Sequence, residues 1–433
     1  MTENAQTGTA RAVLRIPAFR RILLASFLSN TGRWMQSIAQ GVLAWELTES
    51  SQYLGLIVFA GLVPLGLLSL VGGSLADTAD RRKLLLGTQI WQMLGSLTLA
   101  ALVIDDEIAP GLLLVVVFIT ALGQGIYAPT FGSVVPSLAG TENIGAAISL
   151  NSSQIQAARV VGPAIGGWLT SQVGFAEVFA INALTYLAVI FAVYITEFPE
   201  SAGRVRSLSD RLLGGLRLAS RFKQVGRPLL AMFLFAFFCL PFIGQLPAYA
   251  ELRLGIDAVS SSYGWFYACF GLGAFSGAFM VGTFFRATHR PTVARIALVG
   301  FGASQAFLAA VTSLFVAYFA VFLVGLFYFM FPVTMATMWQ EHVTDAVRGR
   351  IAAIWVLSFG GTVPFSNLAA GFIVERTSLQ TIMFASAIAA LILAIGVRFP
   401  RGPVIGDEDL DGLTFNFPGK RFRGRRWLAG NQN

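Results

Sequence analysis

The chain has 433 residues, of which 55% are hydrophobic and only 12% are charged, and its formal net charge is +8. Soluble proteins carry about 25% charged residues, so this composition excludes an ordinary water-soluble domain and predicts a chain that crosses a membrane many times. The two cysteines, Cys239 and Cys269, both fall in apolar stretches, which argues against a disulfide framework and a zinc site.

Apolar stretches follow one another along almost the whole chain, and most reach the length of about 20 residues that a helix needs to cross a bilayer. We therefore predict an all-α membrane protein with twelve transmembrane helices. The expected helices are Phe19–Leu47, Tyr53–Leu75, Leu84–Ile104, Leu112–Val135, Ile144–Thr170, Phe175–Thr196, Pro228–Ala250, Ser260–Phe285, Thr292–Val311, Phe315–Trp339, Ile351–Ile373 and Thr381–Val397.

The charges of the intervening loops alternate along the chain. Of the 30 Lys and Arg, only Arg253 and Arg376 fall in loops on one side, and only Arg33 and Arg159 lie deep inside apolar stretches. The positive-inside rule then predicts that both termini are cytoplasmic and that the chain is a multi-pass protein of the inner (plasma) membrane. Its excess positive charge faces anionic lipids on that side and does not indicate a nucleic acid partner.

A short basic turn, Gly72–Lys83, joins the second and third stretches. It carries Gly73, Asp77, Arg81 and Arg82, and it resembles the Gly-x-Leu-Ala-Asp-x-x-x-Arg-Arg/Lys loop of the major facilitator superfamily. This resemblance implies that Asp77 accepts hydrogen bonds from the start of a helix in the other half and from Arg81 or Arg82, forming a latch that breaks during transport. The alternative is a solvated turn without such a role.

The chain also repeats itself at a shift of about 205 residues, where Thr141–Ile148 aligns with Thr344–Ile351 and Pro129 aligns with Pro332. Two pseudo-symmetric six-helix bundles are expected, which the resemblance identifies as the major facilitator fold with a substrate site between the halves. The expected segments are a cytoplasmic tail (1–18), the first bundle (19–197), a cytoplasmic amphipathic linker (198–226), the second bundle (227–398) and a cytoplasmic tail (399–433).

The fifth stretch holds a proline among glycines, where a helix can kink or approach a neighbour closely. The pattern is similar to the Gly-Pro-x-x-Gly signature of exporters in the superfamily, although Ala158 stands where those proteins usually have glycine. A packed kink is the plainer interpretation. The residues of this motif are Arg159, Gly162, Pro163, Gly166 and Gly167.

Further segments narrow the resemblance. These segments resemble those of the branch that holds macrolide-efflux and enterobactin-export proteins. They are Leu28–Gln36 and Glu46–Ser50 in the opening helix, and Gly123–Gly125 with Pro129 and Pro136 in the fourth. Members of that branch carry unrelated compounds, so the resemblance predicts export but not the substrate.

Two arginines lie deep inside apolar stretches, where an unpaired cation costs at least about 3 kcal/mol. For Arg33, a position facing a water-filled cavity and one packed against helix carbonyls both remain open, and a cavity position would favour an anionic substrate. For Arg159, beside the Gly-Pro kink, we expect packing. The candidates for the substrate cavity are Arg33, Trp34, Gln36, Tyr127, Tyr267 and Tyr328.

No carboxylate lies in the middle of a stretch, so the candidates for proton coupling are peripheral: Glu46, Glu251 and Asp77. The sequence shows no Ser/His/Asp set, metal-ligand cluster or phosphate loop, so we expect neither an enzyme nor a cofactor nor a metal.

These observations predict a secondary active transporter that works as a monomer on a small-molecule substrate. Export of an amphiphilic organic compound (drug-like, siderophore-like or a metabolite) by alternating access with proton antiport is the first hypothesis. Import or facilitated passage of a small metabolite is the second, and a non-transporting membrane receptor or scaffold is an alternative of another class.

Overall fold

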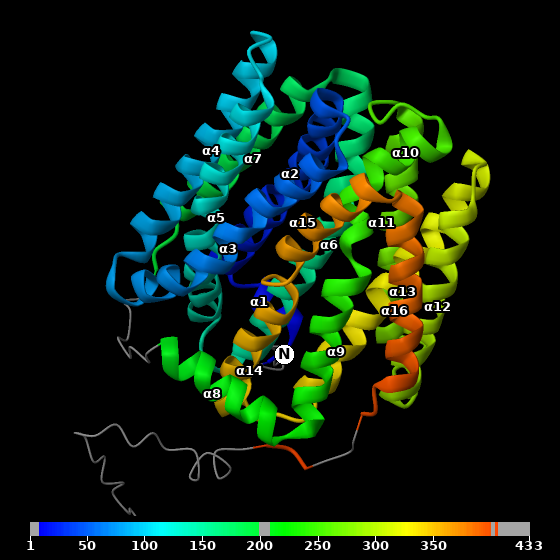
Figure 1. Ribbon diagram of the computed structural model, residues 1–433. Coiled ribbons are helices and arrows are strands. Elements are labelled where there is room, and N and C mark those ends of the chain that lie inside the picture. The colour runs from blue at the N-terminus through cyan, green and yellow to red at the C-terminus, as the bar shows by residue number, and fades with distance from the viewer. Residues whose placement is uncertain (1–7, 199–207, 400–402, 406–433) are drawn as a thin grey trace, which may run out of the picture.

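The computed structural model describes residues 8–198, 208–399 and 403–405, without the side chains of residues 69–78, 141, 208–213, 345, 346 and 349. The described chain is helical almost throughout, and its β-structure is one isolated bridge between Val343 and Ile405. The helices of the first half (blue to green in Figure 1) pack on one side and those of the second half (green to red) on the other. The predicted all-α membrane fold is confirmed.

Along the chain, the helices of the first half come first, a linker helix follows, and the helices of the second half come last. The first half forms α1 (Ala10–Leu14), α2 (Pro17–Thr48), α3 (Ser51–Thr78), α4 (Arg81–Ile104), α5 (Pro110–Ala139), η1 (Thr141–Asn143), α6 (Ile144–Val173) and α7 (Phe175–Tyr194). The linker helix is α8 (Leu208–Arg221). The second half forms α9 (Lys223–Cys239), η2 (Pro241–Gln245), α10 (Leu246–Leu254), α11 (Ser261–Gly282), α12 (Arg290–Ala310), α13 (Leu314–Gln340), α14 (Asp345–Phe359), α15 (Val363–Arg376) and α16 (Leu379–Gly396).

Ten segments of the described chain are long and apolar enough to cross a membrane. The helices α2 and α6, with 32 and 30 residues, are also long enough, but they carry polar side chains along their length. Together with these two, the ten segments account for the twelve predicted spans.

Two predicted helices are interrupted in the structure. The stretch Pro228–Ala250 divides into α9, η2 and α10, and Ile351–Ile373 divides into α14 and α15. Proline at the start of η2 and near the start of α10 lacks a backbone donor, and Gly360 and Gly361 follow the last turn of α14. Hydrophobicity alone does not reveal these breaks, because the side chains on both sides of each break remain apolar.

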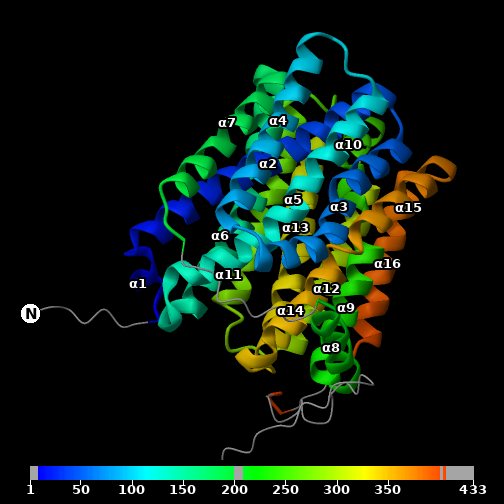
Figure 2. The same cartoon turned by 90° about the vertical axis from the view of Figure 1, so that its left-hand side faces the viewer.

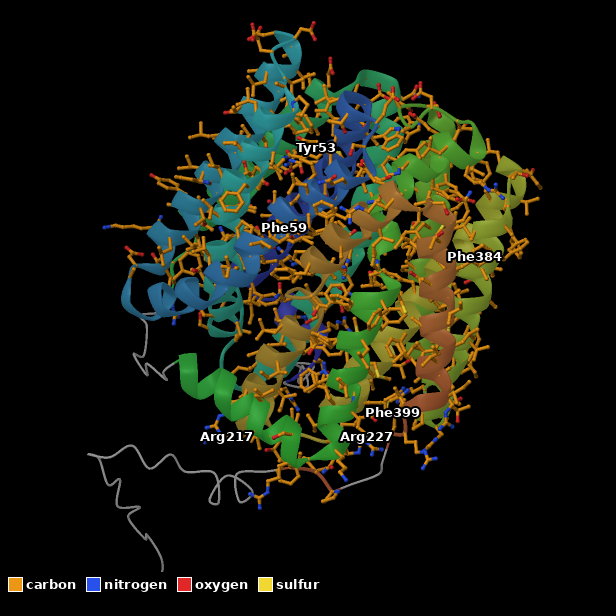
Figure 3. The ribbon with its side chains drawn as sticks, in the orientation of Figure 1. Tyr53, Phe59, Arg217, Arg227, Phe384 and Phe399 are labelled. Atoms are coloured by element: carbon orange, nitrogen blue, oxygen red, sulfur yellow. The ribbon has the colours of Figure 1, made fainter. Side chains whose placement is uncertain are left out.

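Large apolar side chains cover the outside of the bundle. Phe384 on α16 is 42% exposed and points away from the helices that α16 packs against (Figure 3). In a water-soluble protein such a surface would aggregate, whereas in a bilayer it faces lipid. The buried faces of the helices hold alanines, aliphatic side chains and aromatic rings, with some amides and hydroxyls among them.

The two halves meet along two helix pairs, α3 with α15 and α6 with α11. Glycines permit the second contact: a Cβ atom added to Gly264 of α11 would lie 2.9 Å from the backbone oxygen of Gly167 in α6. In the first pair, a Cβ atom added to Gly55 would lie 2.4 Å from the backbone oxygen of Asn367. At these two glycines the halves therefore touch through backbone.

The linker helix α8 packs on α14, and Gly215 lies against the backbone of Arg350. Leu218 is buried on this face, whereas Leu216 and Arg217 are exposed. In both views α8 lies at the opposite end of the molecule from α10 (Figure 1, Figure 2).

Gly264→Val should destabilise the protein by about 1–3 kcal/mol, because its Cβ atom would meet the Gly167 backbone, which cannot move as a side chain can. Thermal unfolding of purified protein in detergent checks this. Gly87→Val on α4 is the matched control, because a Cβ atom there meets nothing within 4 Å. Equal losses in both variants would show that the cost is helix propensity and not the contact between the halves.

Candidate functional site

A cavity of about 220 Å³ lies between the two halves. Both halves contribute, and the interrupted helices of the second half supply much of its wall. Gly41 of α2 lines it, and a Cβ atom there would meet no atom within 4 Å. Its lining residues are Arg33, Trp34, Gln36, Ser37, Ile38, Gln40, Gly41, Leu54, Ile57, Val58, Gly61, Leu62, Gln92, Val117, Thr120, Ala121, Gln124, Arg159, Tyr186, Leu240, Ile243, Gly244, Pro247, Tyr263, Tyr267, Tyr328, Phe359, Val363 and Asn367.

Arg33 projects from α2 into this cavity. Its Nη2 donates a hydrogen bond of 3.4 Å to Oδ1 of Asn30 one turn earlier, while its Nε is buried without a partner among the described residues. The guanidinium carbon lies 5.2 Å from the centroid of the Trp34 ring. The cavity position, one of the two that the sequence left open, is the one that the structure adopts.

Arg159 packs against aromatic rings beside the Gly-Pro kink, and it also lines the cavity. Its guanidinium carbon lies 5.1 Å from the ring centroid of Trp34, 5.7 Å from that of Phe329 and 4.5 Å from that of Phe359. Such cation–π contacts each stabilise an exposed cation by about 0.5–1 kcal/mol. The rings of Phe329 and Phe359 belong to the second half, so this arginine connects the two halves.

None of the residues that line the cavity is Asp or Glu. Arginine remains protonated, so the wall carries two positive charges with aromatic rings and amides around them. This charge follows from the sequence only once the fold has placed the arginines of α2 and α6 on one surface.

An amide and hydroxyl network holds Gln36 in place beside the cavity. Its Oε1 accepts hydrogen bonds of 2.7 Å from Ser96 Oγ and 2.7 Å from Asn182 Nδ2. Asn182 also donates to Ser96 Oγ at 3.2 Å, and its Nδ2 lies 3.5 Å from the hydroxyl of Tyr186. Three helices, α2, α4 and α7, are joined by this buried network.

Of the other residues predicted for the cavity, four line it and one does not. Trp34, Gln36, Tyr267 and Tyr328 line the cavity, with the indole Nε1 of Trp34 buried and unpartnered among the described residues. Tyr127 does not line the cavity, because its side chain faces the interior of the first half. Its ring stacks on that of Phe131, with 5.2 Å between the ring centroids. The sequence analysis missed several polar lining residues, whose signal was an amide or hydroxyl inside an apolar stretch: Gln40, Gln92, Gln124, Tyr186, Tyr263 and Asn367.

The glycines of the motif in α6 have a common role in packing. Cβ atoms added to Gly162 and Gly166 would lie 2.6 Å from the backbone oxygens of Thr31 and Met35 in α2. Gly167 meets α11 in the same way, and Pro163 is buried within the helix. The motif thus allows α6 to lie against a helix of each half, which carries Arg159 to the interface.

The hydrogen bonds between halves that join two described residues gather at one end of the molecule, which we call the joined end. Ser50 and Gln52 of the first half donate to Glu375, and Gln245 of the second half donates to the backbone oxygen of Ser51 at 3.0 Å. Trp45 Nε1 donates to Glu251 at 2.6 Å, and Gln172 donates to Ser261 at 3.0 Å.

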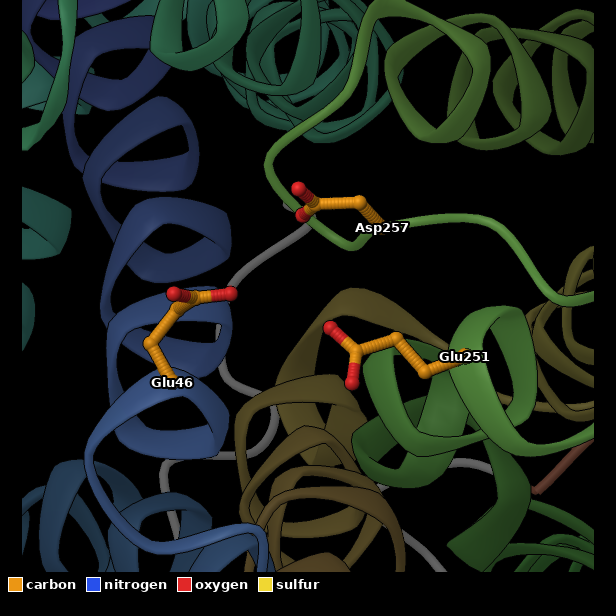
Figure 4. Close-up of side chains that lie close together, drawn as sticks. All are labelled: Glu46, Glu251 and Asp257. Atoms are coloured by element: carbon orange, nitrogen blue, oxygen red, sulfur yellow. The ribbon is translucent and has the colours of Figure 1, made fainter.

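Three carboxylates meet at the joined end. Glu46 of α2, Glu251 of α10 and Asp257 of the following loop have carboxylate oxygens within 4.8 Å of one another (Figure 4). Glu251 also accepts a hydrogen bond from the backbone of Ala258 at 3.3 Å. Carboxylates this close repel one another when all are ionised, so proximity favours a bound proton. The structure thus brings together two of the predicted coupling residues.

The basic turn lies at the other end of α3. The surroundings of Gly73 and the side chain of Asp77 lie outside what the structure describes. Asp80 begins α4 as its N-cap, accepting from the backbone of Arg82 at 2.9 Å and of Lys83 at 3.3 Å. Arg82 donates to the backbone oxygen of Tyr194 and lies over its ring at 5.5 Å, which ties α4 to α7.

Ser96→Ala should lower the free energy of unfolding by about 1–3 kcal/mol, because it leaves buried amide groups of Gln36 and Asn182 with fewer partners. Ser304→Ala is the matched control, since that buried hydroxyl donates only to a carbonyl of its own helix, Phe301. Thermal unfolding of both proteins in the same detergent is the measurement. Indistinguishable midpoints would refute a stabilising role of the network.

Comparison with known families matches residues 8–421 to the family described as transmembrane secretion effector. Among individual relatives, macrolide efflux protein A of Streptococcus pyogenes is 20% identical over 81% of this chain and 87% of its own length. The enterobactin exporter EntS of Escherichia coli is 25% identical over 78% of this chain and 81% of its own length.

The staphyloferrin A transporter of Staphylococcus aureus is 28% identical, but the match covers 42% of this chain and 48% of that protein. Among solved structures, a D-xylose–proton symporter superposes with a TM-score of 0.70, at 14% identity, over 87% of this chain and 98% of its own. At that identity the superposition establishes the fold alone.

Proposed function

Because the chain belongs to the transmembrane secretion effectors, a family of the major facilitator superfamily, we propose that it exports an amphiphilic organic compound by alternating access coupled to proton antiport. The observation that carries the proposal is the cavity between two halves that are joined by hydrogen bonds at one end. A site at the interface of two bundles becomes accessible from either side when the bundles rock about it.

Two findings favour export over import. The relatives matched over most of their length are named as an efflux protein and an exporter. The glycine and proline motif of α6 resembles the exporters' signature, and its Gly167 lies at the contact between the halves, against Gly264 of α11.

The distribution of charge supports an orientation. Arg217 and Arg227 lie at the end that carries α8 (Figure 3). In the predicted topology, the basic turn, Arg290 and Arg398 lie on the same side of the membrane as these two residues. By the positive-inside rule this end is cytoplasmic and the joined end is external. The structure then represents the state in which the external side is closed, with segments 19–197 and 227–398 as the moving bundles in the plasma membrane.

The carboxylates of the joined end are the proposed proton carriers. Glu46 belongs to the first half and Glu251 to the second, so their mutual repulsion opposes closure until at least one proton binds. Protonation would therefore favour the closed external side, and release of the proton would favour its opening. This arrangement couples proton binding to the movement of the halves without any carboxylate at the bilayer centre.

Glu251→Gln should abolish most of the acceleration of efflux by an imposed pH gradient, because the amide keeps the acceptor for Trp45 but cannot ionise. Efflux from proteoliposomes, with solutes chosen from cell accumulation assays on macrolides, dyes and siderophores, measures both direction and coupling. Glu107→Gln, an exposed carboxylate outside the cluster, is the control. Wild-type efflux that ignores the gradient would reject proton antiport, and uptake in place of efflux would reject export.

Asp77→Asn should reduce transport at least tenfold while leaving folded protein in the membrane, because it removes the charge of the proposed latch and keeps its shape. Arg81→Ala should act in the same direction and more mildly. Transport rates normalised to the amount of protein in the membrane are the measurement. Wild-type rates in Asp77→Asn would contradict the latch.

A further inference from the structure

Two guanidinium groups share one indole ring in the cavity. The carbons of Arg33 and Arg159 lie 5.2 and 5.1 Å from the centroid of Trp34. The distance between the two carbons therefore cannot exceed the sum of these values. Two cations thus lie around one ring, at a cavity whose lining residues include no Asp or Glu.

These cations are poorly supplied with acceptors. The one hydrogen bond that Arg33 makes with a described residue is the 3.4 Å contact with Asn30. Its Nε and the Nε1 of Trp34 are buried without partners in the described part of the chain, and the described neighbours of the Arg159 guanidinium are aromatic rings. Burying a donor without an acceptor costs free energy, so a ligand that brings acceptors can form the hydrogen bonds that the protein does not make.

We propose that the cavity binds an organic dianion, with one acidic group at Arg33, the other at Arg159, and an apolar body against Trp34. This inference rests on the proposed transport function and names its substrate class. Two negative charges neutralise the two guanidinium groups in a membrane interior, where a remaining net charge is expensive. Each arginine presents a planar fork that matches a carboxylate, a phenolate pair or a sulfonate.

The surrounding wall fits the apolar part of such a molecule. The rings of Tyr267, Tyr328 and Phe359 come from the second half, and Leu54 and Ile57 come from the first. A dianion held by the arginines of the first half would therefore touch the second half through its apolar body. A cationic or neutral solute would leave both guanidinium groups unneutralised, which disfavours these classes.

The test is calorimetric binding to the purified full chain in detergent, with three probes of one shape: naphthalene-2,6-dicarboxylate, naphthalene-2-carboxylate and neutral naphthalene-2,6-dicarboxamide. We expect the dianion to bind at least tenfold more tightly than the monoanion and the diamide to bind weakest. Diamide binding as tight as that of the dianion, or no binding of the dianion, would overturn the proposal.

Variants test whether Arg33 and Arg159 each bind one acidic group of the dianion. In Arg33→Gln and in Arg159→Gln the preference for the dianion over the monoanion should fall to nearly one, and Arg33→Lys should keep part of it because the charge survives without the fork. Arg376→Gln, an exposed arginine of α15 outside the cavity, should keep the full preference. An undiminished preference in folded Arg33→Gln and Arg159→Gln proteins would overturn the assignment.

Failure of this site is distinguishable from failure of export. Tight dianion binding that both glutamine variants abolish, in vesicles that show no efflux, would support the site and reject the transport proposal. Efflux of dianionic solutes at wild-type rates by both variants would support export and reject the dianion site.

Discussion

The close contact of α6 with one helix of each half is the constraint on which the site depends. Gly162 and Gly166 bring α6 against the backbone of α2, and Gly167 brings it against Gly264 of α11. A side chain at any of these positions would meet the neighbouring backbone and push the helices apart. The same contact that joins the halves thus places Arg159 beside Trp34 and over two rings of the second half.

Charge without a counterion is the second consequence of this arrangement. Membrane helices usually pair their rare cations with carboxylates, and here the carboxylates lie at the periphery while the arginines lie at the interface. Such a separation is costly for a structural role, since replacing the arginines by apolar residues would relieve it. The cost is understandable if the charges act on something that enters the cavity.

Much of the fold could be predicted from the sequence because a bilayer imposes a length and a composition on every span. The repeat at Thr141 and Thr344 and the basic turn before Lys83 likewise identified the superfamily from residues alone. The breaks at Pro241 and Gly360 escaped this reasoning, since hydropathy averages over them. For the site, Arg33, Trp34 and Gln36 were identified, but Tyr127 does not line the cavity, and the cavity position of Arg159 was not predicted. The direction of a side chain depends on helix rotation, which a nearly uniform apolar sequence does not specify.

Gly41 affects how much space the cavity offers to a solute. It lies on the wall of the cavity, and a side chain there would point into unoccupied space rather than into a neighbouring helix. Its substitution would therefore reduce the space for solute without disturbing the packing that stabilises the bundle. In the proposed transporter, a single residue can thus limit the size of the solute without changing the two arginines or the fold.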